Sequence, residues 1–324
     1  MKSFFMSVVV STMNRLEDLE RCLNSLSSQE FLNYEVIVVD SSSEVIAEEV
    51  RRIAQKHNAK YTQEQKKGLS IARNKGVHES SGEIVVFTDD DAVPETSWLK
   101  EISAAFENDA VGFVCGKILT VNNDLEVGVS ASQGTYENVY WGVNLAFRRY
   151  VLEKIGGFDE TFQLAGEDLD VVLKALNSGF KGAYNPKAKV WHVKPTCNSL
   201  RKVVKSEGRN CRGDLFLISK DAKLLISNFK TAPKSLLMNV FNTLCVMLLL
   251  PLLITIVLFF SISSVLWVIP LALIFTYIAV RIWLSKARSS ALVIATIFTP
   301  FLSPVYWFYL VQTLSKNKRF STKH

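Results

Sequence analysis

Residues 83–91 limit the possible folds most strongly, because an apolar run passes into three acidic residues without a turn signal between them. The apolar residues 84–87 are typical of a strand in the middle of a parallel sheet that is covered on both faces. Asp89, Asp90 and Asp91 would then lie at the carboxyl edge of that sheet, where open α/β folds bind ligands. Crowded oxygen ligands favour Mg²⁺ or Mn²⁺, which also bridge to substrate phosphates. The alternative is a solvated acidic turn, or a cap for the helix that follows.

Strands and helices alternate along the first part of the chain. The pattern predicts strands at residues 6–10, 35–39 and 60–63, and helices at residues 16–26, 45–57 and 69–79. This order predicts an α/β fold with a Rossmann-like, doubly wound, mostly parallel sheet. Asn14, with Glu17 three residues later, predicts a capping box at the first helix. The dinucleotide fingerprint GxGxxG is absent from the sequence, which argues against a dehydrogenase.

Two carboxylates, Asp40 and Asp89, end neighbouring predicted strands, where they can hydrogen-bond a base or a ribose. The alternative for Asp40 is a turn-forming residue among serines.

The second part of the predicted domain carries further polar residues. Residues 141–149 predict a strand leading into a short helix, and a later helix begins with acidic residues, of which Glu167 and Asp168 are candidate general bases. Helix-dipole stabilisation is the alternative for such acids. Residues 188–193 predict a strand that contains His192, which is a further candidate metal ligand, although a lone histidine is more often structural.

Charge is distributed unevenly along the chain. Residues 1–197 have a net charge of −7, residues 198–234 of +6 and residues 235–324 of +7. The acidic first part argues against a nucleic-acid partner. The five cysteines are odd in number and lack a CxxC motif, which favours reduced thiols.

The basic last part predicts a membrane region. Residues 235–280 contain no charged residue over 46 positions, and one spanning helix needs about 20. We expect a cytoplasmic catalytic domain at 1–197, a basic amphipathic interfacial segment at 198–234, a transmembrane region at 235–315 and a basic tail at 316–324. Two spans are expected at 236–260 and 265–280, and a third span or a re-entrant segment at 290–314. The expected location is therefore the cell membrane, as a multi-pass protein.

Taken together, residues 6–193 resemble the inverting family-2 glycosyltransferases, which use a nucleotide-sugar donor on an A-type Rossmann-like fold. The motifs that carry the resemblance are SVVVST with Asn14-Arg15, VVDS at 38–41, GLS at 68–70 with ARN at 72–74, TDDD at 88–91, GVN at 142–144, GGFDE at 156–160 and GED at 166–168. Each motif is weak alone, and their order and spacing together are specific.

The resemblance implies roles for individual residues. Asp89 and Asp91 would be the ends of the DxD element, with Asp91 on a Mg²⁺ or Mn²⁺ ion, and Asp168 or Glu167 would be the base. The residues implied to bind the donor are Thr12, Asn14, Arg15, Asp40, Arg73 (near the phosphates), Asn74, Asp89, Asp90 and Asn144. A departure from the family pattern at residues 41–44, where a second acidic residue is usual soon after Asp40, leaves the base contact open.

The expected function is therefore a membrane-anchored glycosyltransferase that adds one sugar to a lipid-linked or cell-surface glycan precursor. Arg209 and Arg212 would bind the diphosphate of a lipid-linked acceptor, and the absence of QxxRW from the sequence argues against a processive synthase. One alternative is a polyprenyl-phosphate sugar synthase, in which the lipid phosphate is the acceptor. A second is a non-catalytic nucleotide-binding membrane scaffold.

Overall fold

A computed structural model describes residues 4–122, 134–136, 140–162 and 165–194, together with positions 217 and 220. The chain divides into two compact units, the first made of residues 1–196 and 224–233. Within the described ranges, no helix has the length and apolarity that a bilayer crossing requires. The predicted spans, the basic tail, Arg209, Arg212 and nearly all of the interfacial segment lie outside the described residues.

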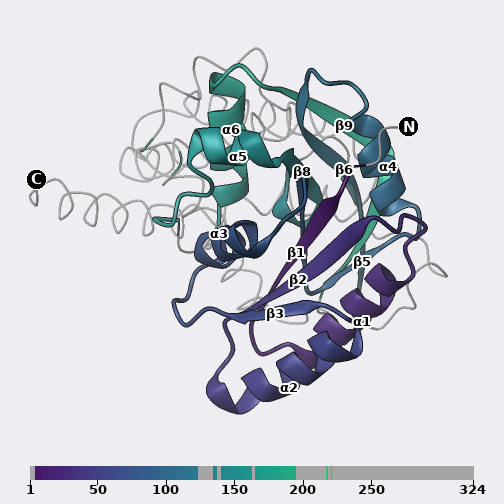
Figure 1. Ribbon diagram of the computed structural model, residues 1–324, viewed down its shortest axis with the longest axis vertical. Helices are drawn as coiled ribbons and strands as arrows, with labels where there is room; N and C mark the ends of the chain where they lie inside the picture. The colour runs from purple at the N-terminus through teal and green to yellow at the C-terminus, as the bar shows by residue number, and fades with distance from the viewer. Residues whose placement is uncertain are drawn as a thin grey trace, which may run out of the picture. The chain divides into compact units, whose positions relative to one another are not determined.

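The first half of the sheet is parallel, as the alternating pattern predicts. Its strands are β1 (Met6–Thr12), β2 (Tyr34–Asp40), β3 (Lys60–Gln63) and β4 (Ile84–Asp89). They lie in the order β3-β2-β1-β4, and β1 pairs in parallel with both β2 and β4. Figure 1 shows β3, β2 and β1 side by side. The carboxyl ends of β1, β2 and β4 therefore meet at one edge of the sheet.

The second half of the sheet is mixed, which corrects the expectation of a mostly parallel sheet. The strands are β5 (Ala92–Pro94), β6 (Val111–Asn122), β7 (Gly134–Tyr136), β8 (Leu145–Arg148) and β9 (Lys181–Lys194). The order continues as β4-β8-β6-β9-β5, with β7 on β6. The pairs β4–β8, β6–β8, β6–β7 and β5–β9 are antiparallel, whereas β6–β9 is parallel. The apolar run of β4 correctly indicated a strand covered on both faces, but β4 is parallel to β1 on one side and antiparallel to β8 on the other.

Helices cover both faces of the sheet and produce two separate cores (Figure 1). In β1, Val8 and Val10 point into one core and Val9 into the other, as the period of two in a strand requires. The first core is covered by α1 (Leu16–Ser27), α2 (Glu44–Lys56) and α4 (Trp98–Ala105). The second is covered by α3 (Leu69–Glu79), α5 (Arg149–Ile155) and α6 (Glu167–Asn177).

The capping box predicted at the start of α1 is wrong. Arg15 occupies the N-cap position, and among the described residues no side chain caps the helix. Asn14 has a left-handed backbone with φ of 58°. Its side-chain Oδ1 accepts a hydrogen bond from the Ser43 amide at 3.2 Å, and its own amide donates to Ser42 Oγ at 2.7 Å. Asn14 therefore joins the loops after β1 and β2, and that longer-range contact takes the place of the cap.

Candidate active site

The three aspartates form the connection between β4 and β5. Asp89 ends β4, Asp90 and Asp91 form a turn, and Ala92 begins β5. Ala92 lies opposite His192 in the antiparallel β5–β9 pair, and the Val193 amide donates to the Asp91 carbonyl at 2.8 Å. The pairing of β5 with β9 therefore places His192 next to the acidic turn, although the two are about 100 residues apart in the sequence.

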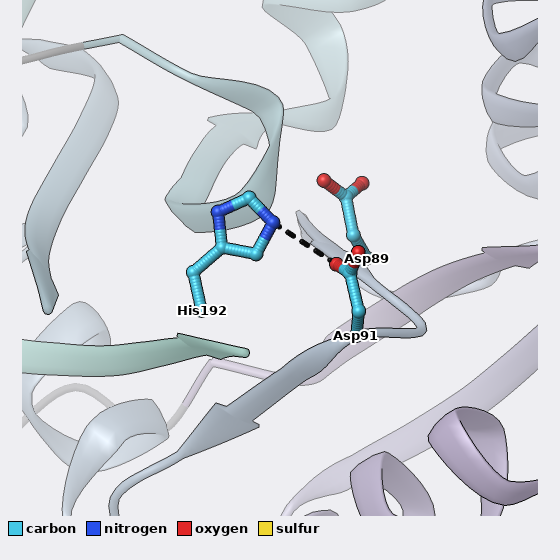
Figure 2. Close-up of side chains that lie close together, drawn as sticks. All are labelled: Asp89, Asp91 and His192. Atoms are coloured by element: carbon cyan, nitrogen blue, oxygen red, sulfur yellow. Dashed lines mark ion pairs between the residues drawn. The ribbon is translucent and has the colours of Figure 1, made fainter. Parts of the chain in front are cut away.

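Asp89, Asp91 and His192 form a group that is suited to hold a metal ion. One ligand atom from each lies within 4.8 Å of the others, and all three side chains are partly exposed. Figure 2 shows the His192 ring facing Asp91, with Nε2 3.1 Å from Oδ1. Buried His192 Nδ1 has no hydrogen-bond partner in the described part of the chain. Two carboxylates and an imidazole suit a divalent cation, so the residues fit the predicted metal.

Arg15 orients the acidic turn. Its Nη1 donates to Asp91 Oδ2 at 2.7 Å and to Asp90 Oδ1 at 3.1 Å. Burial opposes ionisation of Asp91, but the hydrogen bond and charge of His192, with Arg15, outweigh it and lower the Asp91 pKa to about 2. Thr12 donates to the other oxygen of Asp90 at 2.8 Å. Arg15 and Thr12 therefore bind the acidic turn, and their predicted contacts with the donor stay predictions.

Asp40 is fully buried at the end of β2. Its Oδ1 accepts from the Ser42 amide at 2.8 Å, and its Oδ2 accepts from the Tyr61 hydroxyl at 3.0 Å. Burial, followed by the hydrogen bond to Asp40, raises the pKa of Tyr61 to about 12. The turn-forming interpretation of Asp40 is confirmed by the Ser42 contact. Each oxygen keeps a second lone pair, so its contact with a base or ribose stays a prediction.

Arg73 joins the acidic turn to α6. The side chain is 2% exposed, and its guanidinium donates to Asp89 Oδ1 at 3.1 Å through Nη2 and to Glu167 Oε1 at 2.7 Å through Nη1. Although burial lowers the Arg73 pKa, the charges of Asp89 and Glu167 raise it above its ordinary value. Glu167 is thus buried and paired, which disfavours it as the base.

Asp168 differs from its neighbour because it is partly exposed. Its Oδ2 accepts from the Gly142 amide at 3.0 Å, and its Oδ1 accepts from the Leu169 amide at 2.9 Å. Burial and the adjacent Glu167 carboxylate raise the Asp168 pKa to about 7. A pKa near the operating pH is the property that a general base needs.

Asn144 is corrected from a donor-binding residue to a residue of the core. It is 1% exposed, and its Oδ1 accepts from the Trp98 indole at 2.9 Å. Its Nδ2 donates to the carbonyls of Lys117 at 3.1 Å and Ala188 at 3.0 Å. The amide joins α4 to β6 and β9 and has no free surface to offer a ligand.

Asn74 is likewise occupied within the fold. Its Oδ1 accepts from the Phe158 amide at 2.9 Å, and its Nδ2 donates to the Phe158 carbonyl at 2.8 Å and to Glu160 Oε1 at 3.1 Å. Gly157 lies beneath it with φ of 68°, where an added Cβ would be 2.8 Å from Oδ1. These contacts show that Asn74 holds the loop after α5, and because its side chain is partly exposed, its place among the donor-binding residues stays a prediction.

Gly142 is the site residue that sequence reasoning missed. It begins the 3-10 turn η1 (Gly142–Asn144), and its amide holds Asp168. An added Cβ would lie 2.1 Å from Arg73 Nη2. The glycine of the GVN motif was the available signal, but its purpose depends on an arginine that is distant in sequence.

The fold and this site together define a class of protein: an α/β domain with a carboxylate-rich, metal-compatible site at the carboxyl edge of its sheet. Residues 7–172 match the model of the family described as "Glycosyl transferase family 2", and residues 132–213 match that of "Glycosyltransferase like family 2". The chain therefore belongs to glycosyltransferase family 2.

Individual relatives agree with this assignment. Glycosyltransferase AglE from Haloferax volcanii is 28% identical over 197 residues, which are 54% of this chain and 62% of the relative. GalNAc(5)-diNAcBac-PP-undecaprenol beta-1,3-glucosyltransferase from Campylobacter jejuni is 38% identical over 90 residues, 26% of this chain and 29% of the relative. The chain thus spans less than two thirds of the length of these curated relatives.

A solved structure shares the fold. The mannosyltransferase PcManGT from Pyrobaculum calidifontis, solved in complex with GDP-Man and Mn²⁺, superposes with a TM-score of 0.64 at 17% identity. The match covers 96% of this chain and 88% of that one.

Proposed function

We propose that this protein transfers one sugar from a nucleotide-sugar donor to a hydroxyl acceptor, with inversion at the anomeric carbon. The observation that carries the proposal is the continuous contact between two groups: the Asp89, Asp91 and His192 cluster, and the helix that presents Asp168. Arg73 joins them through Asp89 and Glu167. A single displacement needs a base held near the donor site, and this chain of contacts links the two.

The donor half of the site is built from Asp89, Asp91 and His192. A divalent cation held there, when bound, offsets the charge of the donor's diphosphate. The imidazole nitrogen favours Mn²⁺ over Mg²⁺, because Mg²⁺ prefers an all-oxygen shell. The structural neighbour's complex with GDP-Man and Mn²⁺ supports a nucleotide sugar and Mn²⁺ as the pair to test first.

The base half of the site is Asp168. In the proposed reaction, the acceptor hydroxyl oxygen forms a bond with the anomeric carbon, the bond to the diphosphate breaks, and the hydroxyl proton passes to Asp168. The amides of Gly142 and Leu169 hold the carboxylate in one orientation. One carboxylate suffices, because a diphosphate with its charge offset leaves without a proton from a second acid.

The sequence supports a membrane-anchored enzyme with a lipid-linked acceptor. Residues 235–280 carry no charge, and the preceding residues 198–234 carry +6. The Campylobacter relative is named for a PP-undecaprenol substrate, which supports an acceptor of that chemical class. We propose that Arg209 and Arg212 bind the acceptor's diphosphate, since arginine recognises phosphate oxygens with two donors at once.

The test is donor consumption by the purified chain. A panel of UDP-, GDP- and dTDP-sugars with total membrane lipid is incubated with Mn²⁺, Mg²⁺ or EDTA. We expect metal-dependent consumption of one donor, a labelled lipid product, and loss of both in Asp91→Asn and Asp168→Asn. Glu20→Gln is the matched control, because Glu20 is a surface carboxylate of α1 paired with Lys56.

Two results would contradict the proposal. If Asp168→Asn keeps most of its turnover, the acceptor is a lipid phosphate, which needs no general base, and the protein is a polyprenyl-phosphate sugar synthase. If nucleotide binds but no donor is consumed under any condition, the protein is a non-catalytic scaffold.

A further inference from the structure

Arg73 lies where the donor half and the base half of the site meet. Its two terminal nitrogens contact carboxylates from two different elements, Asp89 at the end of β4 and Glu167 at the start of α6. Its guanidinium also lies over the Phe158 ring, with Cζ 5.5 Å from the ring centroid. With the side chain 2% exposed and both terminal nitrogens occupied, little of Arg73 remains for a donor phosphate.

Only arginine fits this position by geometry. A guanidinium presents donors on separate, rigidly spaced nitrogens, so it can hold two carboxylates at a fixed separation. A lysine ammonium is a single point charge at the end of a flexible stem and cannot reproduce that spacing. Arg73 therefore fixes the distance between Asp89 and Glu167, and with it the distance from the donor half to the first turn of α6.

Gly142 extends this arrangement to the base. The absence of a side chain leaves room for Arg73, whose Nη2 would lie 2.1 Å from an added Cβ. The Gly142 amide donates to Asp168 Oδ2 at 3.0 Å. The guanidinium thus packs against the peptide segment that orients Asp168, and Asp168 is held from two sides: through Glu167 in its own helix and through Gly142.

We propose that Arg73 and Gly142 form a positioning pair that fixes Asp168 relative to Asp89, and that Arg73 acts in this way in place of contacting the donor phosphates. The inference rests on the proposed function, because Asp168 is a base only if sugar transfer occurs. It assigns Arg73 an effect on the rate of the bound complex, with little effect on donor affinity.

The charges around Asp168 make the proposal measurable without any substrate. From α6, Glu167 raises the Asp168 pKa, and from α3, Arg73 lowers it. From η1, the Gly142 amide lowers it as well. Asp89 of β4 faces this group through its ion pair with Arg73. Removing Arg73 and removing Glu167 should therefore move the titration of Asp168 in opposite directions.

The first measurement is a carboxyl carbon NMR titration of the full chain labelled with [4-¹³C]aspartate, with the Asp168 signal assigned by its loss in Asp168→Asn. Relative to the natural chain, we expect the midpoint to rise by about one pH unit in Arg73→Gln and to fall by about one pH unit in Glu167→Gln. Arg148→Gln is the matched control, because Arg148 is a buried arginine whose partners include the backbone carbonyls of Phe106 and Val111. It should leave the Asp168 midpoint unchanged.

The second measurement is transfer kinetics with the donor that the natural chain consumes. In Arg73→Lys and in Gly142→Ala, we expect the rate at saturating donor to fall about 10- to 100-fold, with the donor KM changed less than about threefold. Gly142→Ala keeps every charge, and the three atoms nearest to the added Cβ all belong to the Arg73 guanidinium. It therefore tests position even if Arg73→Gln, which leaves two carboxylates unpaired, fails to fold.

Two outcomes would overturn the positioning pair. The first is a donor KM raised tenfold in Arg73→Lys with an unchanged saturated rate, which is the result expected of a phosphate contact. The second is an Asp168 midpoint that moves in neither Arg73→Gln nor Glu167→Gln. The titration uses no donor, so it separates this proposal from the proposed function. If the Asp168 midpoint shifts in opposite directions in the two variants but the natural chain consumes no donor, it is the proposed function that is refuted.

Discussion

Lowering the pH from 8 to 5 should slow the proposed sugar transfer about a hundredfold, because Asp168, the proposed base, becomes protonated within this range. Burial and the neighbouring Glu167 carboxylate raise the Asp168 pKa from 3.8 to about 7. At pH 6 only about a tenth of the molecules carry the ionised base, and at pH 5 about a hundredth. The transfer rate should therefore fall about tenfold and then about a hundredfold below its plateau. An unperturbed aspartate, with a pKa of about 3.9, would lose less than about a tenth of its ionised form at pH 5.

The raised pKa of Asp168 affects the stability of the fold in the opposite direction from its effect on the transfer rate. Between pH 4 and pH 7 the folded chain keeps a proton on Asp168 that the unfolded chain releases. The contribution of Asp168 to the free energy of unfolding is therefore largest at low pH and declines as the pH rises through this window. Activity and this part of the stability should consequently change in opposite directions.

The assay is the initial rate of transfer at saturating donor and metal between pH 5 and 8.5. Metal saturation is verified at each pH. Protonation of Asp91 cannot produce a fall near pH 7, because the pKa of Asp91 is lowered to about 2. Asp90 needs a separate control, since its burial, opposed by Arg15 and reinforced by Asp91, raises its own pKa to about 7.

Asp90→Asn separates the two carboxylates. If Asp168 is the base, this variant has a lower plateau and the same midpoint near pH 7. A rate that stays level from pH 6 to pH 8, or a midpoint that disappears in Asp90→Asn, would refute the assignment of Asp168.

Three further predictions test the surrounding structure. Arg15→Gln removes the donor that orients Asp91 and should weaken Mn²⁺ binding about 10- to 100-fold, measured by the electron paramagnetic resonance of free Mn²⁺; unchanged affinity would show that Arg15 has no part in the metal site. Asn144→Ala removes three hydrogen bonds, two of them buried, and should lower the free energy of unfolding by about 3 kcal/mol in urea titrations, and a loss below about 1 kcal/mol would contradict its role in the core. Gly76→Ala would place a Cβ 2.2 Å from Val9 Cγ1 and should lower the free energy of unfolding by about 1–3 kcal/mol. In a Val9→Ala background the clash is relieved, so the double variant Val9→Ala/Gly76→Ala should be as stable as Val9→Ala alone.

The first part of the fold could be predicted from local patterns alone. The bounds of β3 and α3 agree with those expected from the sequence, because turn residues such as Gly68 before α3 and Ser80-Ser81-Gly82 after it mark element ends locally. The mixed half of the sheet could not be predicted in this way. Strand direction in β6 and β8 depends on partners that are remote in sequence, and residues 120–140 show no readable pattern.

In the candidate site, too, some features could be predicted from the sequence and others depend on packing. The acidic cluster, the histidine and the pair Glu167-Asp168 were found from residue type and position at the ends of elements, and the structure brings the metal-binding group together. Asn144 was misassigned, because an amide looks the same in sequence whether it faces a ligand or the core. Hydrogen-bond partners decide between the two, and they are set by packing.

By itself, the sequence determined the family, the alternating order of the first elements and the kinds of side chain at the carboxyl edge, since these depend on local propensity and motif spacing. Only the tertiary structure decided which carboxylate is buried and paired and which remains available. Glu167 and Asp168 are adjacent in the chain, yet the first meets Arg73 and the second meets the Gly142 amide. That difference arises because successive residues of a helix point in different directions, so neighbours in sequence meet different parts of the fold.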